Sequence, residues 1–201
     1  KVCQQPKQLT SEKQIDSSFS FTNKLADYAA FFKLRLASLV VFSAIFGYLI
    51  AVEAIIWSEI LWLSIGGFLI TGSSNGFNQL IERELDRLMD RTKMRPLVTG
   101  RMTKLEGIWV ASISGLFGIL LLWFKLNPLS GILGCFALFL YVAIYTPLKR
   151  VTPWAVFVGA FPGAIPPMLG WVAAKGHFGL EPGLLFAIQF MWQFPHFWAI
   201  A

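Results

Sequence analysis

Long apolar stretches, separated by short polar breaks, dominate the chain from residue 36 onward. A transmembrane helix needs about 20 mostly apolar residues, and six stretches meet this requirement. They are residues 36–56, 60–80, 107–124, 129–145, 154–174 and 182–201. No break between them resembles a soluble domain. The pattern therefore predicts an all-α fold, a polytopic transmembrane helix bundle with six spans.

The first 32 residues follow a different pattern. They are polar and lack the apolar core of a signal peptide. Residues 19–32 mix apolar and polar positions, which predicts an amphipathic helix on the membrane surface rather than a span. We therefore divide the chain into a polar N-terminal segment, 1–32, and a membrane domain, 33–201.

Composition excludes a soluble or disordered protein. The chain has 201 residues, of which 56% are hydrophobic and only 14% are charged. Soluble domains average about 25% charged residues, and disordered segments have low hydrophobicity. The two cysteines, Cys3 and Cys135, are too few for a disulfide framework, and their spacing does not indicate a zinc site.

The net charge of +6 is distributed unevenly along the chain. Of the 17 Lys and Arg residues, all but Lys125 and Lys175 precede the first span, separate the second from the third, or separate the fourth from the fifth. The positive-inside rule places these segments, and the N-terminus, in the cytoplasm or the mitochondrial matrix. Basic segments gathered on one side of a lipid bilayer account for the net positive charge, so we expect no nucleic-acid partner.

A row of polar residues spaced by four closes the second span: Asn78, Glu82, Asp86 and, if the helix continues, Asp90. Four residues advance an α-helix by about 400°, so the row lines one face. Carboxylates at this spacing repel one another unless a positive group lies among them. Mg²⁺ takes oxygen ligands and commonly shares them with substrate phosphates. The row and the basic loop after it therefore indicate a site for a Mg²⁺-bound diphosphate, with Lys and Arg as anion contacts.

The same charges also suit a solvated helix with surface ion pairs. In that interpretation Glu82 would pair with Arg87, Asp86 with Arg91, and Asp90 with Arg95. The location of the row favours a functional site, because Asn78 and Glu82 lie near membrane depth. Ionisable groups are energetically expensive there and usually functional.

Residues 78–101 resemble the first Asp-rich motif of the UbiA superfamily of intramembrane prenyltransferases, Asn-x-x-x-Asp-x-x-x-Asp followed by a basic loop. Residues 145–150 (Tyr-Thr-Pro-Leu-Lys-Arg), the Pro- and Gly-rich 159–171, and 192–198 (Trp-Gln-Phe-Pro-His-Phe-Trp) resemble one branch of that superfamily. That branch transfers the farnesyl group of farnesyl diphosphate to a vinyl group of haem b, with Mg²⁺ as cofactor. The resemblance covers residues 33–201 and implies a bacterial cytoplasmic or mitochondrial inner membrane protein.

The resemblance also implies roles for individual residues. Asn78, Glu82 and Asp86 match the catalytic metal-binding motif, with Glu82 where the superfamily usually has Asp, and Asp90 matches a further acidic metal ligand. The residues implied in diphosphate binding are Arg91, Arg95, Tyr145, Lys149 and Arg150. The residues implied in haem or isoprenoid contact are Trp192, His196 and Trp198.

Two features have alternative interpretations. His196 is either a haem ligand or porphyrin contact, or a histidine that packs between helices and bonds a backbone carbonyl. Pro162, Pro166 and Pro167 should kink or break the fifth span. The glycines around them either leave room for a flat macrocycle or permit close helix packing.

One departure from the superfamily concerns its second Asp-rich motif, which binds a second Mg²⁺. After Glu106 the chain has one acidic residue, Glu181, which is expected on the opposite side of the membrane. The superfamily also has about nine spans, against the six expected here. We therefore expect a C-terminally incomplete prenyltransferase domain that is inactive alone.

Three other functions compete with haem farnesylation. Another UbiA-type prenyltransferase would act on a quinone or chlorophyll precursor, but the segment 192–198 favours the haem branch. An ion- or proton-coupled transporter would carry acids near the bilayer midplane of several spans, whereas the acids here gather at one end of one span. A non-catalytic respiratory-complex subunit would not explain the acidic row beside the basic loop.

Overall fold

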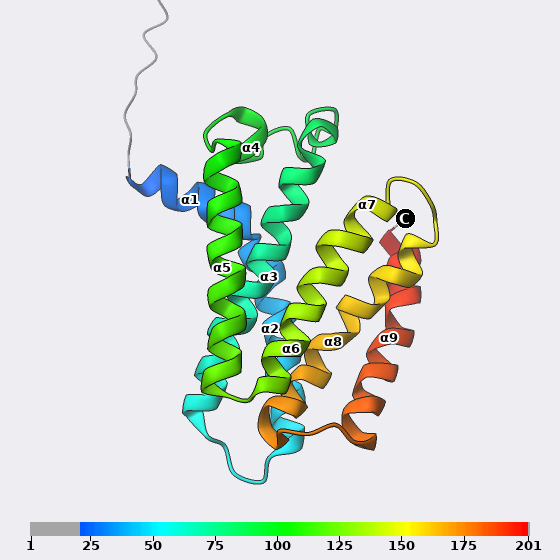
Figure 1. Cartoon of the computed structure of the whole chain (residues 1–201). Coiled ribbons are helices and arrows are strands. Elements are labelled where there is room, and N and C mark those ends of the chain that lie inside the picture. Colours follow the sequence, from blue (N-terminus) through cyan, green and yellow to red (C-terminus); the bar gives the residue numbers. More distant parts are fainter. Residues whose placement is uncertain (1–20, 201) are drawn as a thin grey trace, which may run out of the picture.

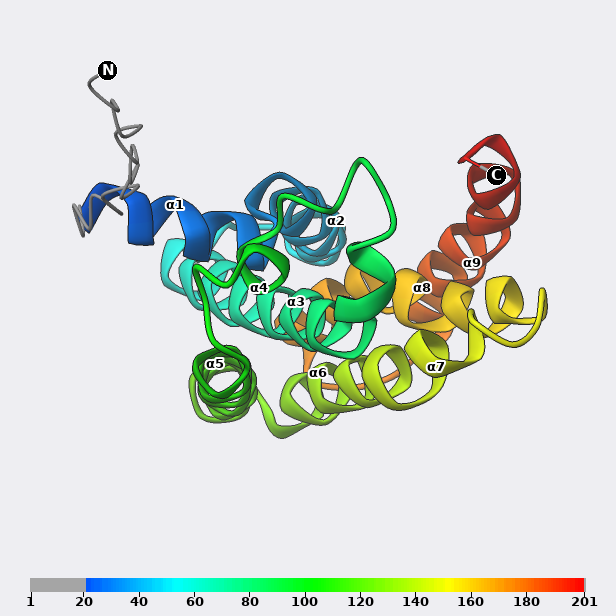
Figure 2. The same cartoon turned by 90° about the horizontal axis from the view of Figure 1, so that it is seen from above.

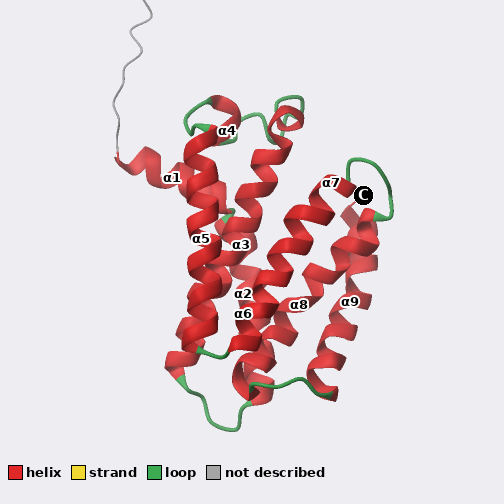
Figure 3. Ribbon diagram, viewed as in Figure 1, coloured by secondary structure: helices red, strands yellow, loops and turns green. Residues whose placement is uncertain are grey.

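A computed structural model of the chain describes residues 21–200, which form helices and loops without strands (Figures 1 and 3). The helices are α1 (Phe21–Phe32), α2 (Leu34–Ala51), α3 (Trp57–Asp86), α4 (Pro96–Thr99), α5 (Lys104–Lys125), α6 (Pro128–Phe139), the π-helical η1 (Leu140–Tyr145), α7 (Thr146–Leu148), α8 (Ala155–Lys175) and α9 (Leu180–Ile200). The predicted all-α class is confirmed.

Each of the six predicted spans coincides with a long helix or, for 129–145, with the continuous run from α6 through η1 to α7. Four are long and apolar enough to cross a membrane: Leu34–Ala51, Lys104–Lys125, Pro128–Leu148 and Ala155–Lys175. The expected second and sixth spans, α3 and α9, do not meet this measure. Ser, Asn and charged residues lower the hydropathy of α3, and Gln, Pro and His lower that of α9. Within residues 21–200, four of the six predicted spans thus meet the measure, and membrane crossing by α3 and α9 stays a prediction.

A helix is confirmed over Phe21–Phe32 of the predicted segment 19–32; this is α1, which lies across one end of the bundle (Figures 1 and 2). Its place on a membrane surface stays a prediction. The ring of Phe31 packs on Gly76 of α3 and the ring of Phe32 packs on Gly72. Residues 1–20, with the predicted polar segment's Lys1, Lys7 and Lys13, lie outside the described residues, as does Ala201. The proposed division at residue 33 stays a prediction.

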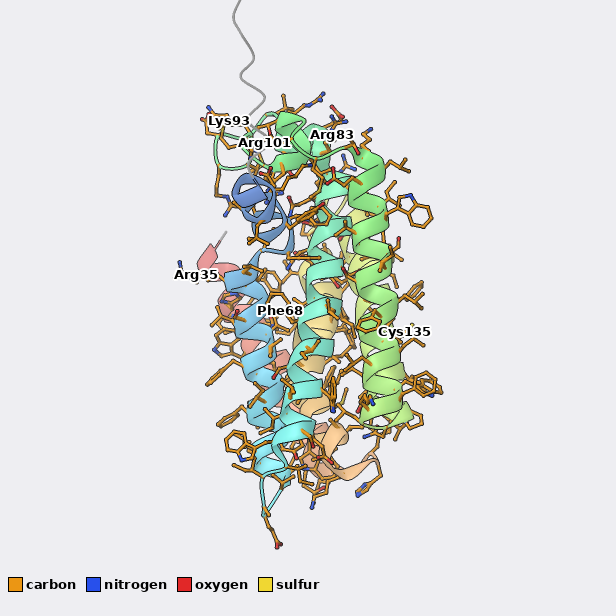
Figure 4. The ribbon with its side chains drawn as sticks, turned by 90° about the vertical axis from the view of Figure 1, so that its left-hand side faces the viewer. Arg35, Phe68, Arg83, Lys93, Arg101 and Cys135 are labelled. Carbon is orange, nitrogen blue, oxygen red and sulfur yellow. The ribbon has the colours of Figure 1, made fainter. Side chains whose placement is uncertain are left out.

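Local sequence signals define the basic connection between α3 and α5. Pro96 begins α4, where its missing N–H costs no helical hydrogen bond, and Gly100 ends α4 at φ 79°, a conformation that favours glycine. Thr103 and Glu106 then form a reciprocal capping box that starts α5. Figure 4 shows Arg83, Lys93 and Arg101 of this region at one end of the bundle. The α7 end of the neighbouring helical run points the same way (Figure 1).

Helix α8 corrects the expectation that its prolines could break it. The helix runs from Ala155 to Lys175 with three prolines inside it. Its glycines permit close packing, as small residues do between membrane helices: a methyl group built on Gly170 would lie 1.8 Å from the carbonyl oxygen of Ala44. The space at Gly159 is taken by the Tyr145 ring, and that at Gly163 by the Gln193 side chain. These positions favour the close-packing interpretation over room for a macrocycle.

Helix α3 is the longest helix of the described chain and packs against α1, α2 and α5. Its first half is apolar and contributes Leu63 and Ile70 to a core shared with α5, α6 and α8. Its second half carries buried polar side chains. The functional groups of α3 are therefore held on a helix that is anchored along its length.

Candidate functional site

The buried polar residues of α3 occupy two faces. Asn75 and Gln79, four residues apart, point at α1, where their amide nitrogens donate to the carbonyl oxygens of Phe32 (3.1 Å) and Phe31 (2.7 Å). Asn78 lies on a neighbouring face and donates to Glu82 Oε2 at 3.1 Å. A single helix therefore anchors the C-terminal end of α1 and presents an amide–carboxylate pair elsewhere.

Glu82 is the first carboxylate of the site. Its Oε2 accepts the Asn78 hydrogen bond, and its Oε1 lies 2.9 Å from Nζ of Lys149, which directly follows α7. The Glu82 and Lys149 side chains are both largely buried, so the pair is less screened than a surface ion pair. The contact joins two helical segments at the end of the bundle that carries the basic loop.

Asp86 is the second carboxylate and the last residue of α3. Its side chain is only 6% exposed and forms an ion pair with Arg95 of the basic loop. The hydroxyl of Thr92 donates to the backbone oxygen of Asp86 at 2.9 Å, and Arg83 Nε donates to Leu97 O at 2.8 Å. These bonds fold the loop back over α3 and so bring Arg95 to Asp86.

None of the surface ion pairs suggested by the sequence forms. Glu82 and Asp86 pair with cations distant in sequence, Lys149 and Arg95. Arg87 pairs instead with Glu84, at 2.9 Å. The acids therefore face groups brought by the fold rather than their neighbours on the helix. We call Asn78, Glu82, Asp86, Arg95 and Lys149 the acid–base cluster.

Asp90 does not join the acid–base cluster. Because α3 ends at Asp86, the row does not continue as a helix face. The Asp90 side chain is 98% exposed and pairs with Lys93 at 2.7 Å. Arg91 and Arg150 are exposed and have no described contact to the cluster. Within residues 21–200, no three Asp, Glu, His or Cys side chains gather at one point.

Tyr145 lies beside the cluster. Nζ of Lys149 lies 5.4 Å from the centroid of the Tyr145 ring, a cation–π contact. That ring is 5.3 Å from the ring of Tyr141 and also packs against Gly159 of α8. The structure thus brings together Tyr145, Lys149 and Glu82, three of the residues singled out by sequence.

The residues implied in haem or isoprenoid contact lie on α9, which packs along α8. The rings of Trp192 and His196 are stacked, with centroids 4.7 Å apart. Trp192 is 53% exposed and Trp198 is 73% exposed. Their role stays a prediction, since the described contacts do not connect them to the acid–base cluster.

Lys33 was not predicted as a site residue from the sequence, where it counted only as one of the basic residues that indicate topology. Burial, followed by the positive charges of Arg95 and Lys149, lowers the pKa of Lys33 to about 8, while Asp86 and Glu82 oppose the shift. Lys33 therefore lies within electrostatic reach of the whole cluster. A signal existed in the sequence, because Lys33 and Arg35 are basic residues close to the start of the first apolar stretch, 36–56.

The cluster fits a hard divalent cation that shares its shell with a phosphate. Asn78, Glu82 and Asp86 supply amide and carboxylate oxygens, the ligand types that Mg²⁺ prefers. Asn78 uses its NH₂ group toward Glu82, which leaves its amide oxygen available. Two carboxylates are few for an all-protein Mg²⁺ site, which agrees with a shell completed by substrate and water.

Curated relatives resemble the chain over most of its length. "Protoheme IX farnesyltransferase" of Christiangramia forsetii is 54% identical over 176 residues, covering 88% of this chain and 58% of the relative. The Flavobacterium johnsoniae protein of that name is 51% identical, covering 92% and 62%. The human mitochondrial protein is 41% identical, covering 84% and 38%. The chain spans about three fifths of the length of the two bacterial relatives.

Solved structures and a sequence family agree on the fold. A digeranylgeranylglyceryl phosphate synthase has a TM-score of 0.76 at 21% identity, covering 84% of this chain and 59% of that one. A UbiA homolog from Archaeoglobus fulgidus bound to DMAPP and Mg²⁺ has a TM-score of 0.65 at 18% identity, covering 85% and 62%. The sequence model of the UbiA prenyltransferase family matches residues 40–201. The chain therefore belongs to the UbiA prenyltransferase family.

Proposed function

We propose that the protein containing this chain transfers the farnesyl group of farnesyl diphosphate to a vinyl group of haem b, forming haem O. The observation that carries the proposal is the acid–base cluster, in which Glu82 and Asp86 are matched by Lys149 and Arg95 at one end of the bundle. The printed names of the relatives support haem as the acceptor. The chain spans 58% of the length of the Christiangramia forsetii relative, so the activity is proposed for the whole protein that contains this chain.

The chemistry assigned to the cluster is heterolysis of an allylic diphosphate. The C1–O bond breaks, its electron pair leaves with pyrophosphate, and Lys149 and Arg95 stabilise the negative charge that develops there. The vinyl π electrons of haem b then form the new C–C bond to the allylic carbon. Water adds to the resulting cation and loses a proton, which gives a hydroxyethylfarnesyl side chain.

The remaining residues hold and shield the reactants. Asn78, Glu82 and Asp86 would hold Mg²⁺, which when bound neutralises the diphosphate and aids its departure. Tyr145 lies beside Lys149 and limits where that ammonium can move. We assign Arg91, Arg150 and Asp90 to outer contacts made by the loops. Apolar helices keep bulk water away from the allylic cation, which it would quench.

We assign Trp192, His196 and Trp198 to haem or isoprenoid contact. The support is their sequence and their exposed aromatic surface on α9. Substituting Trp192 or His196 by Ala should raise KM for haem b and leave KM for farnesyl diphosphate within about twofold, since one site is disturbed and the other is not. A rise in KM for farnesyl diphosphate alone would instead indicate that these residues contact the isoprenoid chain.

We also propose that the N-terminus and both basic loops face the cytoplasm or the mitochondrial matrix. The basic residues of the loops that flank α4, Lys93 and Arg101 among them, lie at the α7 end of the bundle (Figures 1 and 4). Single cysteines placed at Lys93 and Lys175, in a chain with Cys3 and Cys135 replaced by Ser, test the orientation. An impermeant thiol reagent added to intact bacteria should label position 175 and spare position 93, and the opposite result would reverse the topology.

The activity test uses the full-length product of the gene that encodes this sequence, purified in detergent with lipid. Haem b, farnesyl diphosphate and Mg²⁺ are added, and the pigments are separated and weighed by mass spectrometry. We expect haem O, dependent on Mg²⁺ and lost on chelation. Prenylation of a quinone or chlorophyll precursor in place of haem would assign the protein to another branch of the family. Absence of any prenyl transfer would refute the proposal.

A further inference from the structure

Lys33 has a backbone conformation that side chains rarely adopt. It separates α1 from α2 at φ 50° and ψ 61°, in the left-handed region, and it is the only non-glycine residue with positive φ among residues 21–200. Asn and Asp enter this region more readily because their short side chains bond the local backbone. Lysine has no such compensation. Strain of this kind persists only where the surroundings impose it, and it gathers at functional sites.

Helix α3 imposes the conformation. Gln79 Nε2 donates to the carbonyl oxygen of Phe31 at 2.7 Å, and Asn75 Nδ2 donates to that of Phe32 at 3.1 Å. These carbonyls belong to the two residues just before Lys33. Asn75 and Gln79 are both buried. The helix that carries Glu82 and Asp86 therefore also fixes the turn that carries Lys33.

The fixed turn holds a third cation where the charges of Arg95, Lys149, Asp86 and Glu82 act on it. Within the described chain, Glu82 and Asp86 are already paired with Lys149 and Arg95, while the ammonium of Lys33 has no described ion pair. Lys33 also borders open space, a groove of about 560 Å³ that it lines with Arg35 and apolar residues of α1 and α2. The two carboxylates thus have two paired cations, and Lys33 adds a third positive charge that acts on the same groups. The surplus positive charge suits an anion.

We propose that Lys33 is a further substrate-binding residue, whose ammonium contacts the diphosphate of the prenyl donor, and that Asn75 and Gln79 are the residues that position it. This inference rests on the proposed function, which it deepens. In this interpretation the strained turn, the buried amides of Asn75 and Gln79, and the charge of Lys33 all serve to bind the diphosphate. The competing interpretation is a structural elbow whose side chain is incidental.

Three substitutions separate these interpretations. Lys33→Asn removes the charge but tolerates the left-handed conformation, so it should preserve the turn. Lys33→Arg retains the charge. Lys175→Asn, at an exposed lysine in the last turn of α8, is the matched control. A second charge-removing variant, Lys33→Gly, suits the same conformation and guards against a local misfold.

The first measurement is the Kd of inorganic pyrophosphate with Mg²⁺, by calorimetry on the full-length protein, which needs no haem. We expect Lys33→Asn and Lys33→Gly to weaken binding roughly 10- to 100-fold, the range for a charged hydrogen bond. Lys33→Arg should lie within about threefold of wild type, and Lys175→Asn should match wild type. KM for farnesyl diphosphate should rise in parallel, with KM for haem b unchanged.

The outcomes distinguish the two proposals. Wild-type binding of Mg²⁺-pyrophosphate, weakened by Lys33→Asn, supports the inference even if no haem O forms, in which case the proposed function fails. Haem O formation with unaltered pyrophosphate binding by Lys33→Asn overturns the inference and leaves the function standing. Failure of wild-type protein to bind pyrophosphate overturns both.

The positioning residues are tested in a double-mutant cycle. Gln79→Met retains size and removes the amide donor to Phe31. In wild type it should weaken pyrophosphate binding several-fold, because the turn is released and Lys33 no longer points at the cluster. In the Lys33→Asn background it should add little. Additive effects in the double variant would show that Gln79 acts independently of Lys33 and would remove the positioning role.

Discussion

Glu82 of α3 and Lys149 at the end of α7 lie 2.9 Å apart, and Asn78 holds the other oxygen of the Glu82 carboxylate. The carboxylate is thus fixed from two sides, by its own helix and by a distant one. One ion pair both fastens two helices together and sets the geometry of the acid–base cluster. Stability and catalysis should therefore be separable by exchanging the two charges.

The first prediction concerns that exchange. Glu82→Lys and Lys149→Glu should each destabilise the protein by about 1–3 kcal/mol, because a largely buried charge loses its partner. The double variant should recover most of this loss and yet form no haem O, since the cation would sit where metal ligands are needed. Thermal unfolding in detergent and the haem O assay give the two readouts. Recovery of activity by the double variant would contradict the assigned roles.

The second prediction compares two acids of the sequence row. Asp86→Ala should abolish haem O formation without loss of membrane insertion, because Asp86 is buried at the cluster and paired with Arg95. Asp90→Ala is the control: its carboxylate is exposed and pairs only with Lys93, so activity should stay within about threefold of wild type. Equal losses in both variants would return Asp90 to the metal site, and full activity of Asp86→Ala would exclude Asp86 from it.

The third prediction concerns the contact between α2 and α8. A methyl group at Gly170 would meet the carbonyl oxygen of Ala44 at 1.8 Å, and backbone cannot yield as a side chain can. Gly170→Ala should cost about 1–3 kcal/mol or more of unfolding free energy. At Gly67, where the nearest atom lies 3.5 Å away, Gly67→Ala should be neutral. Thermal aggregation in detergent measures both variants, and similar behaviour of the two would refute the close crossing.

The fourth prediction concerns pH and Lys33. Folding lowers the pKa of Lys33 from 10.5 to about 8, so between these values the unfolded chain binds more protons. The contribution of Lys33 to stability therefore rises with pH from about 8 to 10.5, and the penalty is complete below 8. Lys33→Met should be more stable than wild type at pH 7, by a margin that shrinks toward pH 10. Lys175→Met is the control, and a margin independent of pH would count against the shifted pKa.

Much of the fold follows from apolar length, because a helix of about 20 residues is the simplest way to satisfy a backbone in lipid. Apolar length located the long helices within a few residues. It could not show that α8 continues through Pro162, Pro166 and Pro167, because only neighbouring helices decide whether a proline breaks a buried helix. Nor could it separate the four helices that are apolar enough to cross a membrane from α3, whose second half carries buried polar residues.

The site divides in the same way. Spacing by four placed Asn78 beside Glu82, since the helix itself makes them neighbours. The partners of the carboxylates, Lys149 and Arg95, come from other segments. Family resemblance had named both only as diphosphate contacts. Asp90 lies off the row because α3 ends at Asp86, and the spacing by four does not predict where a helix ends. Lys33 was missed because its neighbourhood is created entirely by the packing of α1 on α3.

The π-helical turn η1 sets the direction in which the side chains after it, including that of Lys149, project from the helix axis. It lies between α6 and α7, and the Thr146 hydroxyl donates to Tyr141 O at 2.8 Å across it. Such a turn behaves as an α-helix with a residue inserted, and each residue rotates an α-helix by about 100°. Removing one codon from this stretch would leave α6 packed as before and swing Lys149 to another side of the axis. The ion pair between Lys149 and Glu82 thus depends on the one extra residue in the π-helical turn.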